Sequence, residues 1–359
     1  MVIKNNCLHF RGDIPCKPHK ESGVHCENCP YFKPIEKRII IIKLGAIGDV
    51  IRTTPLLVKL REENKDTEIS WLTYSPDILS PKWVNNILDV SIENIEWLKN
   101  NEFDWLINLD KDKLAISLAK TIRAKKKSGF TMDEFGKCMP FGNKAEKHKW
   151  LTGLWDDISK MNQKNYMEEV FEICGYKFEK EEYILEDTFT GKVDWDINHS
   201  KKVIGLNTGC GGRWKSRLWP EEYWIELAQN LIQKEYEVVL LGGKQENEKN
   251  KRIAKKSGAK YFGHFDLKTF INLVNNVDLV VTAVTMTMHL AIGLKKKLVL
   301  FNNIFNRNEF YLYNRGVILE PEMECECYYS PECKNECMRS IKVRTVFDNI
   351  TMLLQQLDD

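Results

Sequence analysis

The chain has 359 residues, enough for about two domains that each bury a core. Apolar residues make up 43% of the sequence and charged residues 29%, the balance of an ordinary globular protein. The 53 Lys and Arg nearly cancel the 51 Asp and Glu, and the net charge of +2 argues against a globally basic nucleic-acid binder and against an acidic disordered chain.

Eleven cysteines are more than we expect of a cytoplasmic enzyme of this size, and eight of them lie in two groups. The N-terminal cysteine group is Cys7, Cys16, Cys26 and Cys29. The C-terminal cysteine cluster is Cys325, Cys327, Cys333 and Cys337. Such grouping indicates ligands rather than core packing, and the two groups could form separate sites or share one.

Residues 1–35 show little hydrophobic periodicity, which predicts an irregular module organised by something other than an apolar core. Four thiols that end in Cys26-x2-Cys29 suit a structural zinc ion, so we predict that the N-terminal cysteine group binds zinc. An iron–sulfur cluster is the first alternative, and disulfides or free thiols are the others. The C-terminal cysteine cluster is less zinc-like in its spacing.

The first 20 residues contain no apolar stretch, which excludes a secretory signal peptide. The most apolar later stretch, 279–294, is too short and too polar to cross a bilayer. We therefore expect a cytoplasmic protein that keeps its thiols reduced.

Residues 36–190 predict a first Rossmann-like domain. The β-branched run 39–42 predicts a buried strand, Gly45 and Gly48 predict a turn, and Asp49 opens an amphipathic helix. Asp49 can be read as a helix cap or as a carboxylate held ionised at the helix N-terminus to act as a base, and the two readings are compatible. Further strands are predicted at 68–73, 105–108 and 127–130, with helices at 113–123 and 166–174.

Residues 131–160 predict loop structure, and the surrounding stretch 119–149 is basic. It holds nine Lys or Arg against three Asp or Glu. The stretch can be solvated surface, or it can attract an anionic substrate to the protein. The polar, turn-rich stretch 186–202 is the best candidate for an interdomain linker.

Residues 200–342 predict a second Rossmann-like domain, followed by a C-terminal helix at 343–357. Strands are predicted at 203–207, 237–241, 260–262, 278–282 and 297–301, with helices from Pro220, at 267–275 and at 287–294. Strands that alternate with helices in both halves indicate an α/β protein with two doubly wound parallel sheets.

Two strand-to-helix loops of the second half have the chemistry of a phosphate site. The tract 207–220 reads NTGCGGRWKSRLWP and combines a hydroxyl, glycines and three cations directly before a helix. Lys215 and Arg217 could neutralise a diphosphate without a metal. Thr285, Thr287 and His289 lie at the start of another predicted helix.

These motifs carry a resemblance to glycosyltransferase family 9, the ADP-heptose:lipopolysaccharide heptosyltransferases. KLGAIGDVIRTTPLL is similar to the opening motif of that family, and NTGCGGRWKSRLWPEEYW to its donor-phosphate loop. DLVVTAVTMTMHLAIGL is similar to its donor-site helix, and CYYSPECKNECMRSI to its C-terminal cysteine motif. The resemblance covers about residues 38–345 and implies a GT-B fold of two Rossmann-like domains that face across a cleft.

The resemblance also implies roles for individual residues. Asp49 would be the general base of an inverting reaction that needs no cofactor or metal. The donor nucleotide-sugar would contact Thr208, Gly209, Lys215, Arg217, Gln245, Glu246, Thr285, Thr287 and His289. We expect Gly48 and Arg52, with Lys120 and Arg123 of the basic stretch, to bind the acceptor, an anionic glycan or glycolipid. Such an acceptor would place the protein at the cytoplasmic face of the inner membrane.

The sequence departs from the family at two places. Gln245 stands where the family has a Glu, unless the register shifts by one residue, and the second departure is in the donor-site helix. The family pattern is Asp-Thr-Gly-x-x-His, whereas Val284 and Met286 stand at the Asp and Gly positions here. Another nucleotide-sugar, or a repacked donor site, is therefore an alternative to ADP-heptose. A sugar-nucleotide epimerase or hydrolase of the same fold and a non-catalytic nucleotide-sugar-binding protein are the alternative functions.

Overall fold

The computed structural model describes residues 2–63, 65–185 and 193–355 and forms two compact units. The first unit comprises Met1–Trp150 and Glu169–Glu181, and the second comprises Leu151–Glu168 and Glu182–Asp359. The short segment Leu151–Glu168 therefore belongs with the second half of the chain. Part of the predicted linker, residues 186–192, lies outside the described residues.

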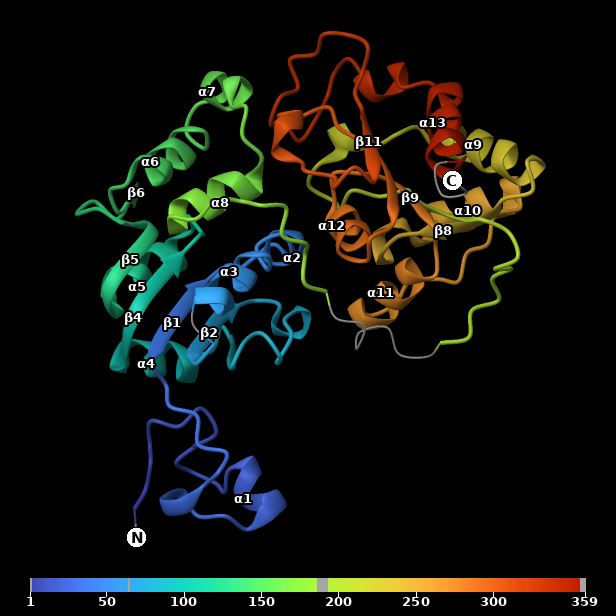
Figure 1. Cartoon of the computed structure of the whole chain (residues 1–359). Coiled ribbons are helices and arrows are strands. Elements are labelled where there is room, and N and C mark those ends of the chain that lie inside the picture. Colours follow the sequence, from blue (N-terminus) through green and yellow to red (C-terminus); the bar gives the residue numbers. More distant parts are fainter. Residues whose placement is uncertain (1, 64, 186–192, 356–359) are drawn as a thin grey trace. The chain divides into compact units, whose positions relative to one another are not determined.

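The first unit contains a six-stranded sheet of order β3-β2-β1-β4-β5-β6, in which only the β5–β6 pair is antiparallel (Figure 1). Its strands are β1 (Lys37–Ile42), β2 (Thr67–Thr73), β3 (Asn86–Asp89), β4 (Glu102–Asn108), β5 (Arg123–Met132) and β6 (Cys138–Pro140). The four isoleucines of β1 are completely buried, as a strand between two others and covered on both faces requires.

The helices up to the second sheet are α1 (Lys17–Ser22), α2 (Ile47–Ile51), α3 (Leu56–Glu63), α4 (Ile92–Asn100), α5 (Lys113–Thr121), α6 (Lys144–Leu151), α7 (Asp156–Met161) and α8 (Tyr166–Cys174). Asp112 caps α5, because its carboxylate accepts hydrogen bonds from the backbone N–H groups of Leu114 and Ala115. The apolar face of α5 packs on the sheet in a core cluster with Leu98 of α4.

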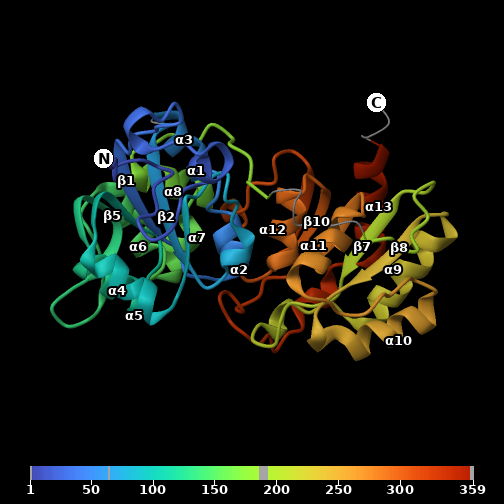
Figure 2. The same cartoon turned by 90° about the horizontal axis from the view of Figure 1, so that it is seen from below.

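The second unit contains a five-stranded, entirely parallel sheet of order β11-β10-β9-β7-β8. Its strands are β7 (Val203–Asn207), β8 (Glu237–Leu241), β9 (Leu279–Ala283), β10 (Lys297–Phe301) and β11 (Gly316–Leu319). Its main helices are α9 (Glu221–Gln233), α10 (Asn247–Ser257), α11 (Leu267–Asn275), α12 (Met286–Gly293) and α13 (Val343–Gln355). Figure 2 shows α9 and α10 beside β7 and β8.

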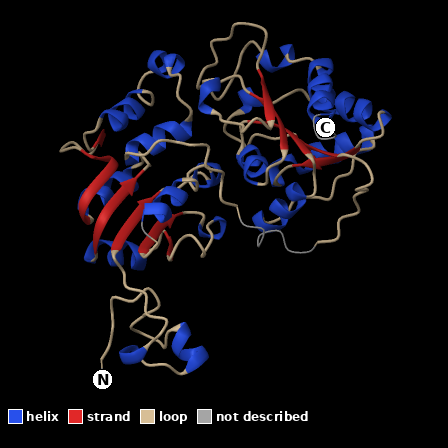
Figure 3. Ribbon diagram, in the orientation of Figure 1, coloured by secondary structure: helices blue, strands red, loops and turns tan. Residues whose placement is uncertain are grey.

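One face of this sheet is covered by α9, α10 and α13, whose apolar residues form a single core cluster with the strands. Trp219, just before α9, packs edge-on against Trp224 with ring centroids 4.8 Å apart, and against Phe301 of β10 at 5.1 Å. The other face carries α12, which contacts β9 and β10 and is buried almost throughout. The sheet is therefore doubly wound, as predicted (Figure 3).

The predicted strands and helices differ from the observed ones mostly by one to three residues at their ends. The predicted strand 260–262 is only an isolated bridge between Lys260 and Val239. The largest error is residues 131–160, predicted as loop but containing β6, α6 and α7. The sequence pattern does not predict helix α6, because this helix has no apolar stripe and its one buried residue is Glu146.

Glu146 is a buried carboxylate that organises the end of β5. Its side chain accepts hydrogen bonds from the backbone N–H groups of Gly129 (2.8 Å), Gly142 (2.7 Å) and Asn143 (2.9 Å). Gly129 has a φ of +99°, and a Cβ there would lie 1.8 Å from the carbonyl oxygen of Asn108. The carboxylate thus provides an acceptor for one backbone N–H group of β5 and for two in the turn before α6.

Replacing Glu146 with Ala should lower the free energy of unfolding of the first unit by about 3 kcal/mol, because buried N–H groups lose their acceptor. Urea denaturation of the full chain followed by tryptophan fluorescence measures the change. Glu134→Ala, at an exposed position in the same region, is the matched control and should change stability by less than about 0.5 kcal/mol. Equal effects of the two substitutions would contradict this role for Glu146.

The order of strands in each sheet defines where a ligand can bind. In the first sheet the winding direction reverses between β1 and β4, and in the second it reverses between β7 and β9. The loops that leave two such strands diverge to opposite faces, which opens a crevice at their carboxyl ends. The loops after β1, β4, β7 and β9 are therefore the places to look for a site.

Candidate functional site

Asn207, the last residue of β7, connects the loops that follow β7 and β9. Its side-chain amide donates hydrogen bonds to the carbonyl oxygen of Gly209 (3.2 Å) and to the hydroxyls of Thr282 (2.8 Å) and Thr285 (3.4 Å). The hydroxyls of Thr282 and Thr285 also lie 3.1 Å apart. This buried network holds the glycine-rich loop against the start of α12.

Thr285 caps α12 and brings three predicted site residues to the N-terminus of that helix. Its hydroxyl accepts a hydrogen bond from the backbone N–H of Thr287 (3.2 Å). Thr287 and His289 are buried, and the His289 ring stacks on Tyr183 with ring centroids 6.1 Å apart. A capped helix N-terminus favours negative charge, as a phosphate site requires.

The loop between β8 and α10 forms a third wall of the same site. A Cβ on Gly209 would come within 2.2 Å of the Glu246 carboxylate, and one on Gly212 would come within 3.4 Å of the Gln245 amide. The Thr208 hydroxyl donates to Asn250 of α10 (2.6 Å). Three loops thus bring the predicted donor residues together, and only glycine allows the close approach of Glu246 at position 209.

Arg217 is held by two backbone carbonyl oxygens of the loops. Its guanidinium is buried and donates hydrogen bonds to the backbone carbonyl oxygens of Val284 and Cys210, the latter at 3.1 Å. Burial lowers the pKa of Arg217. Its Nε is also buried and has no hydrogen-bond partner within the described residues. Arg217 therefore joins the glycine-rich loop to the loop after β9, whereas Lys215 is exposed.

Lys249 of α10 is a site residue that the sequence did not reveal. Its ammonium donates to the carbonyl oxygen of Thr208 (2.8 Å), and burial lowers its pKa. In the sequence it is one of several lysines on a polar helix. Only the packing of α10 against the glycine-rich loop distinguishes it.

The C-terminal cysteine cluster has the geometry of a metal site. Its four Sγ atoms all lie within 4.8 Å of one another, with Cys325 and Cys333 3.3 Å apart and Cys327 and Cys337 3.6 Å apart. A tetrahedral zinc with bonds of about 2.3 Å needs sulfurs about 3.8 Å apart. Among the described residues this is the group of His, Cys, Asp and Glu whose ligand atoms are close enough to hold a metal ion. The spacing of the cysteines along the sequence, in contrast, favours the N-terminal cysteine group as a zinc site.

The C-terminal cysteine cluster is hydrogen-bonded to the short helical turn that carries Lys215 and Arg217. The backbone N–H and the hydroxyl of Ser216 donate to the carbonyl oxygens of Pro331 (2.9 Å) and Ser330 (2.6 Å). The Asn303 amide lies between the two parts, 2.8 Å from the Ser216 carbonyl oxygen and 3.4 Å from Cys337 Sγ. The cluster therefore anchors the part of the glycine-rich loop that carries Lys215 and Arg217.

In the first unit, the carboxyl ends of β1 and β4 are joined by a buried ion pair between Lys43 and Asp110. Asp110 also accepts the backbone N–H of Leu44, and Lys43 donates to the carbonyl oxygen of Gly45 (3.0 Å). Burial raises the pKa of Asp110, and the Lys43 ammonium opposes this. We had not predicted this pair, although a charged residue directly after a buried strand is a usable signal.

Asp49 lies in the first turn of α2, as predicted. Its carboxylate accepts the backbone N–H of Ala46 (3.2 Å) and pairs with Arg52 (2.7 Å). These two contacts hold the carboxylate in place. The side chain of Asp49 is 32% exposed and therefore remains accessible to a reactant. Gly48, in the same turn, is buried.

Lys120 and Arg123 do not gather around Asp49. Arg123 begins β5 and lies opposite Glu102, with which it forms an ion pair, at the amino edge of the sheet. The Asp49 loop follows the carboxyl end of β1, at the other edge. Lys120 donates to the carbonyl oxygen of Asp133 (3.1 Å).

Other members of the basic stretch 119–149 are also paired. Lys125 forms an ion pair with Asp104 (2.8 Å), and Lys149 forms one with the buried Glu169 (2.5 Å). Nearby, burial lowers the pKa of Lys111 to about 8. Carboxylates therefore offset at least Arg123, Lys125 and Lys149 of this stretch.

A family model described as Glycosyltransferase family 9 (heptosyltransferase) matches residues 93–314, which is more than half of the chain. The chain belongs to glycosyltransferase family 9. It is accordingly a glycosyltransferase that uses a nucleotide-sugar donor. A comparison with curated protein sequences finds no match.

Solved structures show that this family 9 enzyme has the GT-B fold. A family 9 glycosyltransferase from Veillonella parvula is 18% identical, with a TM-score of 0.66 over 89% of this chain and 98% of that one. E. coli heptosyltransferase WaaC with ADP-2-deoxy-2-fluoro heptose is 15% identical, with a TM-score of 0.63 over 88% and 99%. The dodecameric iron-containing heptosyltransferase TibC of E. coli, in complex with ADP-D-beta-D-heptose, is 14% identical, with a TM-score of 0.57 over 90% and 79%.

No helix among the described residues of this family 9 enzyme is both long and apolar enough to pass through a bilayer.

Replacing Cys327 with Ser should remove about one equivalent of metal per chain, because a tetrahedral site closed by thiolates needs all four ligands. Elemental analysis of the purified full chain measures the metal content. Cys138→Ser, outside both cysteine groups, is the control and should keep the metal content of the wild type. Equal metal content in all three proteins would contradict a metal at the C-terminal cysteine cluster.

Proposed function

We propose that this enzyme transfers a heptose from ADP-heptose to a lipopolysaccharide-type or other glycan acceptor, with inversion at the anomeric carbon. The family description names heptosyltransferases, and two of the similar structures contain ADP-heptose or a fluorinated analogue. The convergence of three loops at the switch point of the second sheet carries the proposal, because it builds a phosphate site at the carboxyl ends of β7 and β9.

The donor diphosphate would lie between the glycine-rich loop and the N-terminus of α12. Backbone N–H groups near Gly209 and at Thr285–Thr287 would donate to phosphate oxygens. The buried Nε of Arg217 would gain the acceptor that it lacks, and Lys215 would supply further positive charge. No catalytic metal is required, because these groups neutralise the leaving diphosphate.

The ribose and the sugar would lie toward the β8–α10 loop. The Glu246 carboxylate beside Gly209 can accept hydrogen bonds from ribose hydroxyls, and Gln245 lies beside it near Gly212. Val284, at the position of the family aspartate, offers its backbone carbonyl oxygen to Arg217. Donor recognition would therefore rely on Arg217, which holds the loop after β9 through the Val284 carbonyl oxygen. It would not need the aspartate side chain that other family members have at this position.

Asp49 would act as the general base. It accepts the proton of the acceptor hydroxyl while the hydroxyl oxygen forms a bond to the anomeric carbon, and the bond from that carbon to the diphosphate oxygen breaks to release ADP. Arg52 and the backbone N–H of Ala46 hold the carboxylate in one orientation. We place Gly48 and Arg52 at the acceptor, which would be anionic, and we assign no acceptor contact to Lys120 or Arg123.

The C-terminal cysteine cluster would hold a structural metal in this scheme. Four thiolates leave no open position on a tetrahedral ion, so the metal would take no part in bond making. TibC is iron-containing, which makes iron the natural alternative to zinc here. Either ion would brace the phosphate loop through Ser216.

Asp49→Asn should lower kcat by about 10²- to 10⁴-fold, because the amide cannot accept the acceptor proton, while ADP binding stays unchanged. The assay follows ADP release from ADP-heptose with a lipopolysaccharide-core acceptor, and calorimetry measures ADP binding. Asp157→Asn, exposed on α7, is the control. Turnover of Asp49→Asn at the wild-type rate would reject the base. ADP release that does not depend on acceptor would favour a hydrolase, and binding without turnover of any nucleotide-sugar would favour a non-catalytic protein.

Arg217→Lys should weaken ADP binding about tenfold, or about 1.4 kcal/mol, although the charge is kept. A lysine ammonium cannot span the carbonyl oxygens of Val284 and Cys210 as the guanidinium does. Calorimetric titration with ADP measures the change. Arg213→Lys, exposed in the same loop, should alter the affinity less than about twofold. If both variants bound ADP like the wild type, Arg217 would have no part in the donor site.

A further inference from the structure

The N-terminal module, residues 2–35, lacks the apolar core that a folded segment needs. Its only helical segments are the six-residue α1 and the turn Cys26–Asn28, and Cys7 and Pro18 are its only buried residues. Fewer than about 40 residues rarely fold on apolar burial alone and usually need disulfides, a metal or a partner. Its four cysteines are free thiols.

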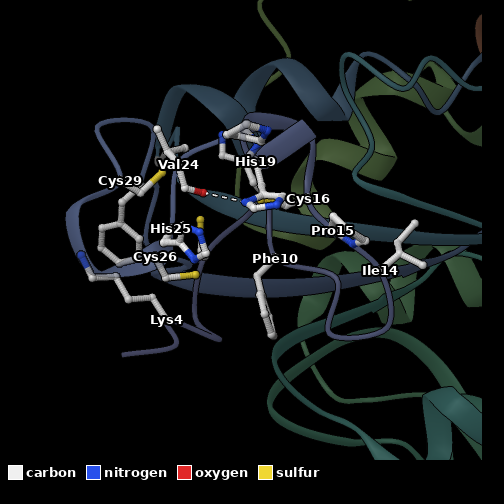
Figure 4. Close-up of a pocket in the computed structure, with 14 residues that line it drawn as sticks. Lys4, Phe10, Ile14, Pro15, Cys16, His19, Val24, His25, Cys26 and Cys29 are labelled. Carbon is white, nitrogen blue, oxygen red and sulfur yellow. Dashed lines mark hydrogen bonds between the residues drawn. The ribbon is translucent and has the colours of Figure 1, made fainter. Parts of the chain in front are cut away.

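The potential metal ligands of the module converge on one pocket of about 240 Å³ (Figure 4). The pocket is lined by the whole N-terminal cysteine group and by three imidazoles: Cys7, Cys16, Cys26, Cys29, His9, His19 and His25. The residues come from the irregular start of the module, from Cys16 and His19 at the beginning of α1, and from the turn Cys26–Asn28 with its two flanking residues. Thiols so widely spaced in the sequence line one pocket because the chain wraps around it, although their sulfur atoms are not yet as close together as those of the C-terminal cysteine cluster.

His19 connects the segments that carry the cysteines. Its Nδ1 lies 3.0 Å from the carbonyl oxygen of Val24. A carbonyl only accepts, so Nδ1 carries the proton and donates. His19 belongs to the helix that follows Cys16, and Val24 precedes Cys26 by two residues, so this bond fixes two ligand-bearing segments relative to each other. The rings of His19 and His25 also meet edge to face at 5.2 Å.

The two ends of the module are joined beside Cys7. The backbone N–H of Leu8 donates to Lys33 (2.8 Å), and that of Ile35 donates to Asn6 (2.7 Å). These bonds pair Cys7 with Pro34 in a short bridge and direct the buried Cys7 toward the pocket. The bridge thus holds Cys7 at the pocket, and the His19–Val24 bond joins the segments that carry Cys16 and Cys26.

We propose that this pocket is a structural zinc site with the thiolates of Cys7, Cys16, Cys26 and Cys29 as its ligands. On binding, each thiol releases its proton to solvent and forms a bond to one Zn²⁺ ion. Among the described residues the C-terminal cysteine cluster is the group that is already close-packed, and zinc would draw the N-terminal sulfurs together in the same way. Four thiolates are a complete ligand set for a tetrahedral structural zinc ion.

This site is separate from the proposed transfer reaction. The module precedes the residues 93–314 that match the family, and none of its residues has a role in the donor site or at Asp49. The ion would replace an apolar core as the element that holds the module together. Failure of this proposal would therefore leave the glycosyltransferase assignment intact.

Elemental analysis of the full chain, expressed with added zinc, tests the ligands. Cys26→Ser with Cys29→Ser should remove about one zinc per chain compared with the wild type. Combining them with Cys327→Ser should remove one metal more, because the two cysteine groups are independent, and Cys138→Ser should remove none. No loss of zinc in the Cys26→Ser, Cys29→Ser protein would overturn the proposal. A brown protein with iron and inorganic sulfide in its place would also overturn it.

Limited trypsin digestion provides a test that does not depend on folding of the Cys26 and Cys29 variants. The protein used is Cys327→Ser, which has lost the second site. A zinc chelator should speed cleavage after the exposed Lys20 of α1 at least tenfold, and added zinc should restore protection. Unchanged cleavage with and without chelator would overturn the proposal.

Discussion

The proposed donor site depends on one constraint, which is that β7 and β9 are parallel neighbours whose helices lie on opposite faces of the sheet. A crevice opens at their carboxyl ends. Asn207 at the end of β7 lies at the base of this crevice and donates hydrogen bonds to the segments after β7 and at the end of β9. Thr208, Gly209 and Thr285 have their positions only because those strands end side by side. The Lys43–Asp110 pair marks the equivalent point of the first sheet.

Polar contacts rather than an apolar core hold the glycine-rich loop after β7. A loop rich in glycine has few side chains to bury, so its shape depends on hydrogen bonds to the neighbouring segments. Arg217 holds it on one side through two carbonyl oxygens, and Ser216 anchors it to the C-terminal cysteine cluster on the other. Thiolates around a metal are suited to this task, because a few short covalent-like bonds replace many apolar contacts. The same reasoning applies to the module around Cys26.

Much of the architecture could be predicted from periodicity. The isoleucines of β1 and the apolar residues of α13 follow patterns that burial imposes, and both elements were found close to their predicted bounds. Helix α6 could not be predicted, because Glu146 stabilises it through backbone hydrogen bonds and not through an apolar face. The pairing of the basic stretch could not be predicted for a related reason: Glu102 and Asp104, the partners of Arg123 and Lys125, belong to β4, 21 residues earlier in the sequence.

By itself, the sequence determined the two α/β halves, the position of Asp49 in a helix turn and the strand-to-helix loops to which we assign the donor phosphates, because hydrophobic period and glycine spacing are local properties. Tertiary structure alone decided that Arg217 binds loop carbonyls, that Lys249 reaches Thr208 and that the C-terminal cysteines are close-packed. These outcomes depend on residues that are distant in sequence and meet only when the sheet forms. The net charge of +2 likewise does not say which lysines are paired, and ion pairs such as Lys125–Asp104 are visible only in the folded chain.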